Sequence, residues 1–223
     1  MMHRQARQAR SRKKLRRRLF FLLLLIAIIA AEGAVLRGYL VETKRIDWRL
    51  ILVNDENPMP EKYDIELTDL FNGTRVDSRI YPDLQRMFDD ARAQGLHPIV
   101  SEGYRTREEQ EAMLQIYVDR FLAQGYSQEQ ARELALDYVA EPGTSEHELG
   151  IAVDINASEG YSSQAVYSWL ADNAWRYGFI LRYPSGKEEI TGISYEPWHY
   201  RYVGADAAAA IYEQGLTLEE YLH

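Results

Sequence analysis

The pattern of apolar and polar positions predicts helices that alternate with short strands. In the helix expected to start at a cap at Asp77 or Ser78 and to end near Gln94, the apolar residues at helical spacing are Leu84, Met87, Phe88 and Ala91. A second helix is expected from Thr106 to Ala123, because T-R-E-E offers a cap and acids in the first turn. A third is expected over Ser127–Ala140.

Runs of branched and aromatic residues predict the strands. They lie at 48–54, 97–105, 150–156, 179–184 and 194–204. In the third run, Ile151, Val153 and Ile155 alternate with Ala152 and Asp154, so Asp154 should face away from the large apolar side chains. Residues 55–67 hold two prolines and predict a surface loop, and residues 185–192 predict a turn.

Three more helices are expected near 163–177, 205–214 and 217–222. Helices and strands do not alternate in regular βαβ units, and the sequence has no internal repeat. This order of elements favours an α+β domain. Most of the 223 residues should share one core, since 46% of them are hydrophobic.

Charge divides the chain into two unequal parts. Residues 1–18 hold nine Lys or Arg and no acid, whereas residues 19–223 hold 17 basic groups against 34 acids. An acidic body does not suit nucleic acid, which needs a basic face for its phosphates. We therefore expect no nucleic-acid partner.

An apolar run over 19–31 follows the basic segment and extends to about 36. We interpret 1–18 as a basic cytoplasmic segment, 19–36 as a membrane anchor or signal peptide, and 37–47 as a stalk. If the run is an anchor, the chain is a single-pass protein of the cytoplasmic membrane with its body outside the cytoplasm. If it is a cleaved signal, the body is secreted. Both interpretations stay open.

The candidate chemistry depends on histidine and carboxylate. The chain has no cysteine, so a metal site here would need His, Asp or Glu ligands. Residues 145–154 read SEHELGIAVD, which offers His147 and Asp154, and residues 196–199 read EPWH, which offers Glu196 and His199. We hypothesise that the two histidines and Asp154 hold one Zn²⁺ with a fourth position open to water, and that Glu196 acts as general base.

Other residues suggest contacts with a substrate. Arg105 ends a strand after Gly103, where a fixed guanidinium can pair with a carboxylate, and Gln110 follows five residues later. Ser145 either shapes its loop or contacts a substrate carboxylate. Arg182 and Tyr183, in RYPSGK, either line the cleft or support His199.

Four segments together resemble the VanY-type D-alanyl-D-alanine carboxypeptidases, a zinc peptidase family that also includes L,D-carboxypeptidases of peptidoglycan. They are GYRT with the later Gln, PGTSEHELGIAVDI, GFILRYPSGKEEITG and YEPWHYRYVG, between about residues 50 and 204. The resemblance implies a small antiparallel sheet with flanking helices, of the hedgehog/D,D-peptidase type, over residues 48–223. It also implies zinc on His147, Asp154 and His199, with Glu196 as base and Arg105 supporting substrate or oxyanion.

The resemblance further implies an enzyme that removes the C-terminal D-alanine from peptidoglycan stem peptides, by D,D- or L,D-cleavage. Two alternatives stay open, a non-catalytic sensor of wall peptides and a peptidoglycan endopeptidase. The two acids that flank His147, Glu146 and Glu148, are expected to be exposed.

Overall fold

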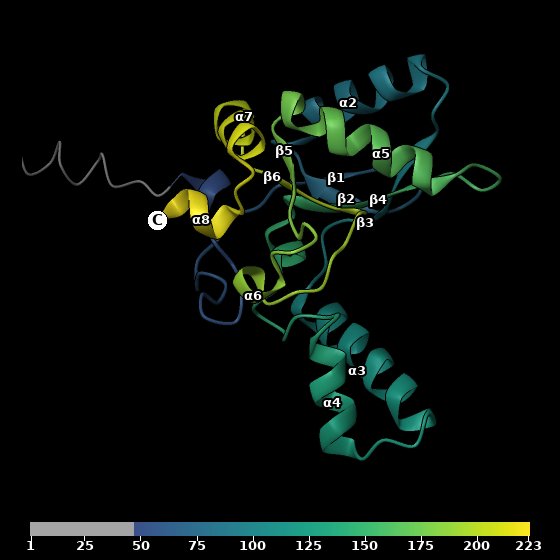
Figure 1. The fold of residues 1–223 in the computed structure, drawn as a ribbon, viewed down its shortest axis with the longest axis vertical. Coiled ribbons are helices and arrows are strands. Elements are labelled where there is room, and N and C mark those ends of the chain that lie inside the picture. Colours follow the sequence, from purple (N-terminus) through teal and green to yellow (C-terminus); the bar gives the residue numbers. More distant parts are fainter. Residues whose placement is uncertain (1–46) are drawn as a thin grey trace, which may run out of the picture. The chain divides into compact units, whose positions relative to one another are not determined.

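A four-stranded antiparallel sheet forms the centre of the body. The computed structural model describes residues 47–223. The strand order is β3 (Pro98–Glu102), β4 (Ala152–Ala157), β6 (His199–Tyr202) and β5 (Phe179–Leu181), with every neighbouring pair antiparallel (Figure 1). The sheet together with its helices is the α+β fold that the sequence predicted.

Helices α2 (Tyr81–Ala93) and α5 (Ser163–Asn173) lie together on one side of this sheet (Figure 1). The buried residues of α2 are the four predicted from helical spacing, Leu84, Met87, Phe88 and Ala91. The large branched residues of β4 also belong to this core, at Val153 and Ile155. Asp154 therefore faces the opposite side, as the alternation predicted.

Helices α3 (Arg107–Ala123) and α4 (Gln128–Leu136) form an antiparallel hairpin that projects from the end of the body opposite α2 and α5 (Figure 1). Each begins with a capping box, at Thr106 and at Ser127. The hairpin has an apolar cluster of its own, made of Leu114, Val118, Ala131, Ala135 and Val139.

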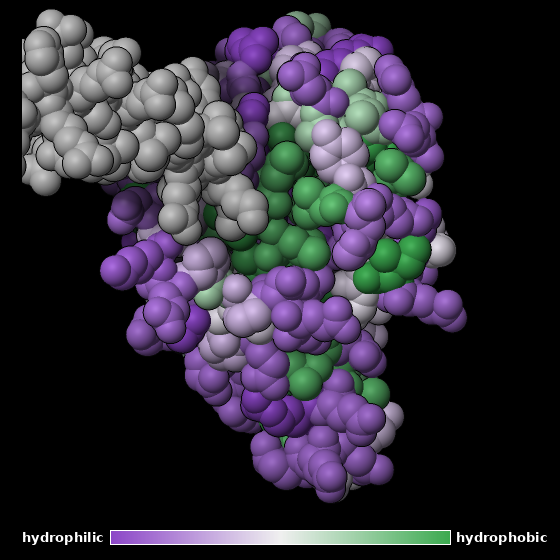
Figure 2. Space-filling view, turned by 90° about the vertical axis from the view of Figure 1, so that its left-hand side faces the viewer, coloured by the Kyte–Doolittle hydropathy of each residue, from purple (hydrophilic) through white to green (hydrophobic). Residues whose placement is uncertain are grey.

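Short elements complete the body. They are η1 (Trp48–Leu50), β1 (Leu67–Asp69), β2 (Arg75–Asp77), η2 (Glu146–Leu149), η3 (Ala174–Tyr177), α6 (Glu188–Thr191), α7 (Ala205–Gln214) and α8 (Leu218–Leu222). On the face that carries α7 and α8, apolar side chains gather at mid-height and hydrophilic ones dominate below (Figure 2).

The strand predicted over 48–54 is wrong. Only the 3-10 turn η1 forms there, followed by irregular chain. The reason lies in a distant side chain, because Arg201 Nη2 donates to the carbonyl oxygens of Arg49 at 3.1 Å and Ile51 at 2.8 Å. These backbone acceptors are thus satisfied without a partner strand.

Several other predicted boundaries also differ. Helix α2 starts after Ile80 instead of Asp77 or Ser78, because the Asp77 carboxylate is engaged by Arg79. Helix α4 ends at Leu136 instead of Ala140. The last predicted strand forms only over His199–Tyr202.

The expectations for residues 1–46, including the anchor or signal, fall outside the described residues. Within 47–223, no helix combines the length and the apolar character that a membrane crossing requires.

Candidate metal centre and active-site cleft

Two neighbouring strands and one short helix bring three candidate metal ligands together. Asp154 on β4 is the register partner of His199 on β6, so both side chains project from one face of the sheet. His147 lies on η2, whose first turn is capped by the Ser145 side chain. One donor atom from each of the three residues lies within 4.8 Å of the other two.

The donor atoms suit a single zinc ion. Asp154 Oδ1 lies 3.5 Å from His147 Nε2 and 3.2 Å from His199 Nδ1, yet it is buried without a hydrogen-bond donor. Such an orphaned oxygen is costly unless a cation or a donor compensates it. Two imidazole nitrogens and one carboxylate oxygen, with a fourth position open, are the ligand pattern of catalytic zinc.

Charge is tightly coupled at this centre. Burial raises the pKa of Asp154, but His147 and His199 outweigh it and hold that pKa well below its ordinary value. Burial lowers the pKa of His199, whereas the neighbouring carboxylates of Asp154 and Glu146 raise it, to about 9 overall. A proton on His199 therefore competes with a cation for this site.

The far nitrogen of His147 is also fixed. Its Nδ1 lies 2.8 Å from the Gly103 carbonyl oxygen, to which it donates. A ligand histidine that donates its second N–H to a carbonyl has a set tautomer and ring orientation. Nε2 of His147 is thereby the nitrogen that faces Asp154.

Glu196 lies in the loop before β6, with a carboxylate oxygen 3.5 Å from His199 Nδ1. Its backbone N–H donates to the Tyr183 carbonyl oxygen at 3.1 Å, which ties the loop to the segment after β5. Burial raises the pKa of Glu196 to about 7, with Asp154 adding to the rise and His199 and Arg105 opposing it. A carboxylate tuned to this range can both accept and return a proton near neutral pH.

Arg105 is buried at the edge of the same cleft and is held by its neighbours. Its Nη1 donates to Gln110 Oε1 at 2.7 Å, and its Nη2 lies 3.4 Å from Glu102 Oε2. Gln110 in turn donates to the Ala140 carbonyl oxygen at 2.7 Å. Gln110 thus uses both ends of its amide within the protein, and its observed contacts orient Arg105.

The cleft that contains these residues has a volume of about 180 Å³. Ser145 and Tyr183, both predicted as substrate contacts, line it together with Arg105 and Gln110. The Tyr183 ring packs against His199 with 4.8 Å between ring centroids. The proposed ligands, Glu196 and these four residues therefore lie around one hollow, whereas Arg182 does not line it and is buried against Glu146 and Glu219.

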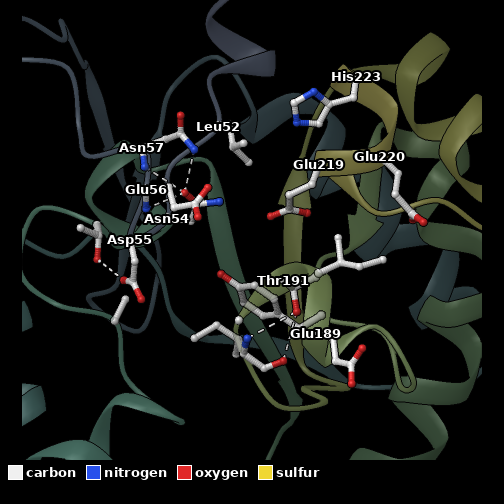
Figure 3. Close-up of a pocket in the computed structure, with 16 residues that line it drawn as sticks. Leu52, Asn54, Asp55, Glu56, Asn57, Glu189, Thr191, Glu219, Glu220 and His223 are labelled. Atoms are coloured by element: carbon white, nitrogen blue, oxygen red, sulfur yellow. Dashed lines mark hydrogen bonds between the residues drawn. The ribbon is translucent and has the colours of Figure 1, made fainter.

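A larger hollow of about 640 Å³ lies beside this cleft and shares Ala140, Tyr183 and Ile193 with it. It contains none of the three candidate ligands. Figure 3 shows it lined by acids from three parts of the chain, the early loop with Asp55, helix α6 with Glu189 and the C-terminal helix with Glu219. We place the chemistry in the smaller cleft, because only that cleft has the donor atoms.

The expectation that Glu146 and Glu148 are exposed is wrong. They are 2% and 8% exposed, since η2 turns both into the protein. Glu146 forms ion pairs with Arg182 at 2.7 Å and Arg201 at 2.8 Å. Sequence reasoning missed this network, although the alternation in β6, which places Arg201 on the face of His199, was a signal for it.

Comparisons with known proteins show what this chain is similar to. The family model for VanY, D-alanyl-D-alanine carboxypeptidase, matches residues 73–205. A D-alanyl-D-alanine carboxypeptidase of Enterococcus faecalis is 57% identical over 178 residues, which cover 79% of this chain and 66% of that protein. The chain thus spans just under two thirds of that relative's length.

Two solved structures are similar over the same region. A mutant of the vancomycin resistance D,D-pentapeptidase VanY from a VanB-type resistance cassette, in complex with Zn(II), has a TM-score of 0.78 and 56% identity, covering 79% of this chain and 100% of its own. VanYB in complex with D-alanine-D-alanine has a TM-score of 0.77 and 56% identity, covering 79% and 98%.

Proposed function

Because the chain belongs to the VanY family of D-alanyl-D-alanine carboxypeptidases, we propose that residues 48–223 act as a zinc-dependent D,D-carboxypeptidase. The substrate would be the stem pentapeptide of peptidoglycan, and the product free D-alanine. The observation that carries this proposal is the convergence of three metal-ligating atoms with Glu196 and Arg105 in one cleft. The zinc and D-alanine-D-alanine complexes of two relatives support it.

Each residue has a defined part in this reaction. When bound, a zinc ion held by His147, Asp154 and His199 supplies a Lewis acid that lowers the pKa of water and polarises a peptide carbonyl. Glu196 accepts a proton from the attacking water and delivers it to the nitrogen of the departing D-alanine. Arg105 pairs with the terminal carboxylate of the peptide.

Neighbouring residues orient Arg105 and shape the cleft. Gln110 holds one of its nitrogens, so the remaining guanidinium N–H groups have a restricted direction. Ser145 and Tyr183 shape the wall of the cleft around the peptide end. A fixed carboxylate partner favours removal of a terminal residue over cleavage within a chain.

A paired cleavage assay tests the proposal. The zinc-loaded full-length chain is incubated with a stem pentapeptide that ends in D-Ala-D-Ala and with the matching tetrapeptide, and products are read by mass spectrometry. We expect loss of one D-alanine from the pentapeptide. Cleavage of the tetrapeptide alone would reassign the enzyme as an L,D-carboxypeptidase, and internal cuts would make it an endopeptidase.

The Glu196→Ala variant separates catalysis from metal binding. It should retain one zinc by elemental analysis and lose turnover, because the three ligand residues remain. Zinc binding without cleavage of any stem peptide by the unmodified chain would instead favour the non-catalytic sensor.

We also propose that the apolar run 19–36 places this domain outside the cytoplasmic membrane, either as an uncleaved anchor or as a cleaved signal. The substrate supports this, because peptidoglycan lies on that side. Fractionation of cells that express the chain with a C-terminal tag distinguishes membrane-bound from released protein. Retention in the cytoplasm would contradict both forms.

A further inference from the structure

Glu146 lies behind the metal centre with no part in the proposed reaction. Helix η2 directs His147 into the cleft and the preceding Glu146 into the protein, where its side chain is fully buried. Its Oε1 accepts from Arg182 Nε at 2.7 Å and from Arg201 Nη1 at 2.8 Å. Arg182 is anchored in turn by Glu219, at 2.5 and 2.9 Å. Two acids and two guanidinium groups thus balance in charge.

The other oxygen of Glu146 has no partner in this network. Glu146 Oε2 and His199 Nε2 are both buried atoms without a hydrogen bond, and they lie 3.7 Å apart. The opposite nitrogen of His199, Nδ1, faces Asp154 and Glu196 at 3.2 and 3.5 Å. Since Nδ1 is the nitrogen offered to the metal, the proton of a neutral imidazole belongs on Nε2, opposite Glu146.

The network makes Glu146 a rigid acceptor. Burying a carboxylate is costly unless it is paired and hydrogen-bonded. The guanidinium groups of Arg182 and Arg201 both pair with one oxygen of Glu146, Oε1. The second oxygen therefore stays an acceptor aimed at His199.

We infer that Glu146 is a positioning residue for the metal centre. Its carboxylate accepts a hydrogen bond from Nε2–H of His199 and so keeps the Nδ1 lone pair directed toward Asp154 and Glu196. The inference rests on the proposed function for the identity of the metal alone. A carboxylate behind a ligand histidine fixes its tautomer and ring orientation. We expect the two atoms to close from 3.7 Å to hydrogen-bond distance when Nδ1 binds the ion.

The Glu146→Gln variant tests this role with a sharp electrostatic change. Arg182 and Arg201 offer only donors, so the amide oxygen must turn toward them and the amide NH₂ toward His199. A donor opposite Nε2 favours the tautomer with its proton on Nδ1, which cannot bind a metal there. We expect zinc affinity, measured by competition with a chromophoric chelator, to fall about 10- to 100-fold.

Glu148→Gln is the matched control. It removes a second buried carboxylate from the same helix, but Glu148 contacts Gly143 N and Arg107 instead of His199. We expect its zinc affinity to match that of the unmodified chain. Equal losses in both variants, or no loss in Glu146→Gln, would overturn the inference.

A second measurement needs no variant and so stands even if Glu146→Gln fails to fold. Long-range ¹H–¹⁵N spectra of the zinc-loaded chain report which imidazole nitrogen of each histidine carries a proton. We expect Nε2–H at His199 and Nδ1–H at His147. A proton on His199 Nδ1 would refute the role of Glu146. Both readouts are independent of substrate cleavage, so failure here is distinguishable from failure of the proposed carboxypeptidase activity.

Discussion

Replacing Gly103 by alanine should weaken zinc binding, although Gly103 is not itself a metal ligand. A Cβ at this position would lie 2.2 Å from the backbone oxygen of Arg75, whereas real Cβ atoms essentially never approach within 3.0 Å, so the backbone must move by about 0.8 Å. The Gly103 carbonyl oxygen is also the acceptor for His147 Nδ1 at 2.8 Å. Losing such a supporting contact typically weakens metal binding about 10- to 100-fold, and the overpacking costs about 1–3 kcal/mol of stability.

The assay compares zinc affinity with the free energy of unfolding of the metal-free protein in urea. Gly160→Ala serves as control, because Gly160 has a φ of 85° and a Cβ there meets nothing within 4 Å. A residue forced into that left-handed region costs about 1–2 kcal/mol, so the control loses comparable stability without touching the site. Wild-type zinc affinity in Gly103→Ala, or an equal loss of affinity in Gly160→Ala, would refute the reasoning.

Three further predictions address the base, the arginine and the hairpin. Glu196 must be unprotonated to act, and its pKa in the metal-free protein is about 7, so kcat/KM should fall as the pH drops. The midpoint should lie at or below pH 7, because a bound cation favours the charged carboxylate. A pH profile of kcat/KM from 5 to 9 checks this, and a rate that rises toward acid pH would contradict it. Gln110→Ala should lower kcat/KM about 10-fold or more, because it removes the hydrogen bond that orients Arg105, and hydrogen bonds to charged groups contribute about 1.5–3 kcal/mol. Steady-state kinetics, with zinc content unchanged, test this prediction, and an unaltered kcat/KM would exclude it. Leu114→Ala should destabilise the hairpin by about 2–5 kcal/mol in urea unfolding, and a change below 1 kcal/mol would show that its cluster contributes little.

Local signals predicted the elements whose hydrogen bonds are local. The capping boxes at Thr106 and Ser127 each involve residues within a four-residue stretch, and both helices begin where expected. The segment 48–54 has the composition of a strand, but its acceptors are satisfied by Arg201, about 150 residues away. No pattern within seven residues contains that partner, so the prediction failed there.

The same distinction applies to the site. His147, Asp154 and His199 occur in motifs with definite spacing. The pairing of β4 with β6 brings Asp154 and His199 together, and η2 adds His147, as the hypothesis required. The burial of Glu146 depends on Arg182 and Arg201, which come from the segment after β5 and from β6. A charged residue looks solvent-exposed in sequence until its counter-charges are placed, and only the fold places them.

Strand β6 supplies both a candidate metal ligand, His199, and a fully buried cation, Arg201. Its period of two puts His199 and Arg201 on one face, and both side chains meet Glu146. Arg201 also holds the backbone at Arg49 and Ile51, where the chain enters the domain. The Glu146 carboxylate therefore lies between the imidazole of the proposed ligand His199 and the guanidinium of Arg201, which holds the start of the domain. Since such buried groups are strongly coupled, metal affinity and stability should respond together to changes at Arg201.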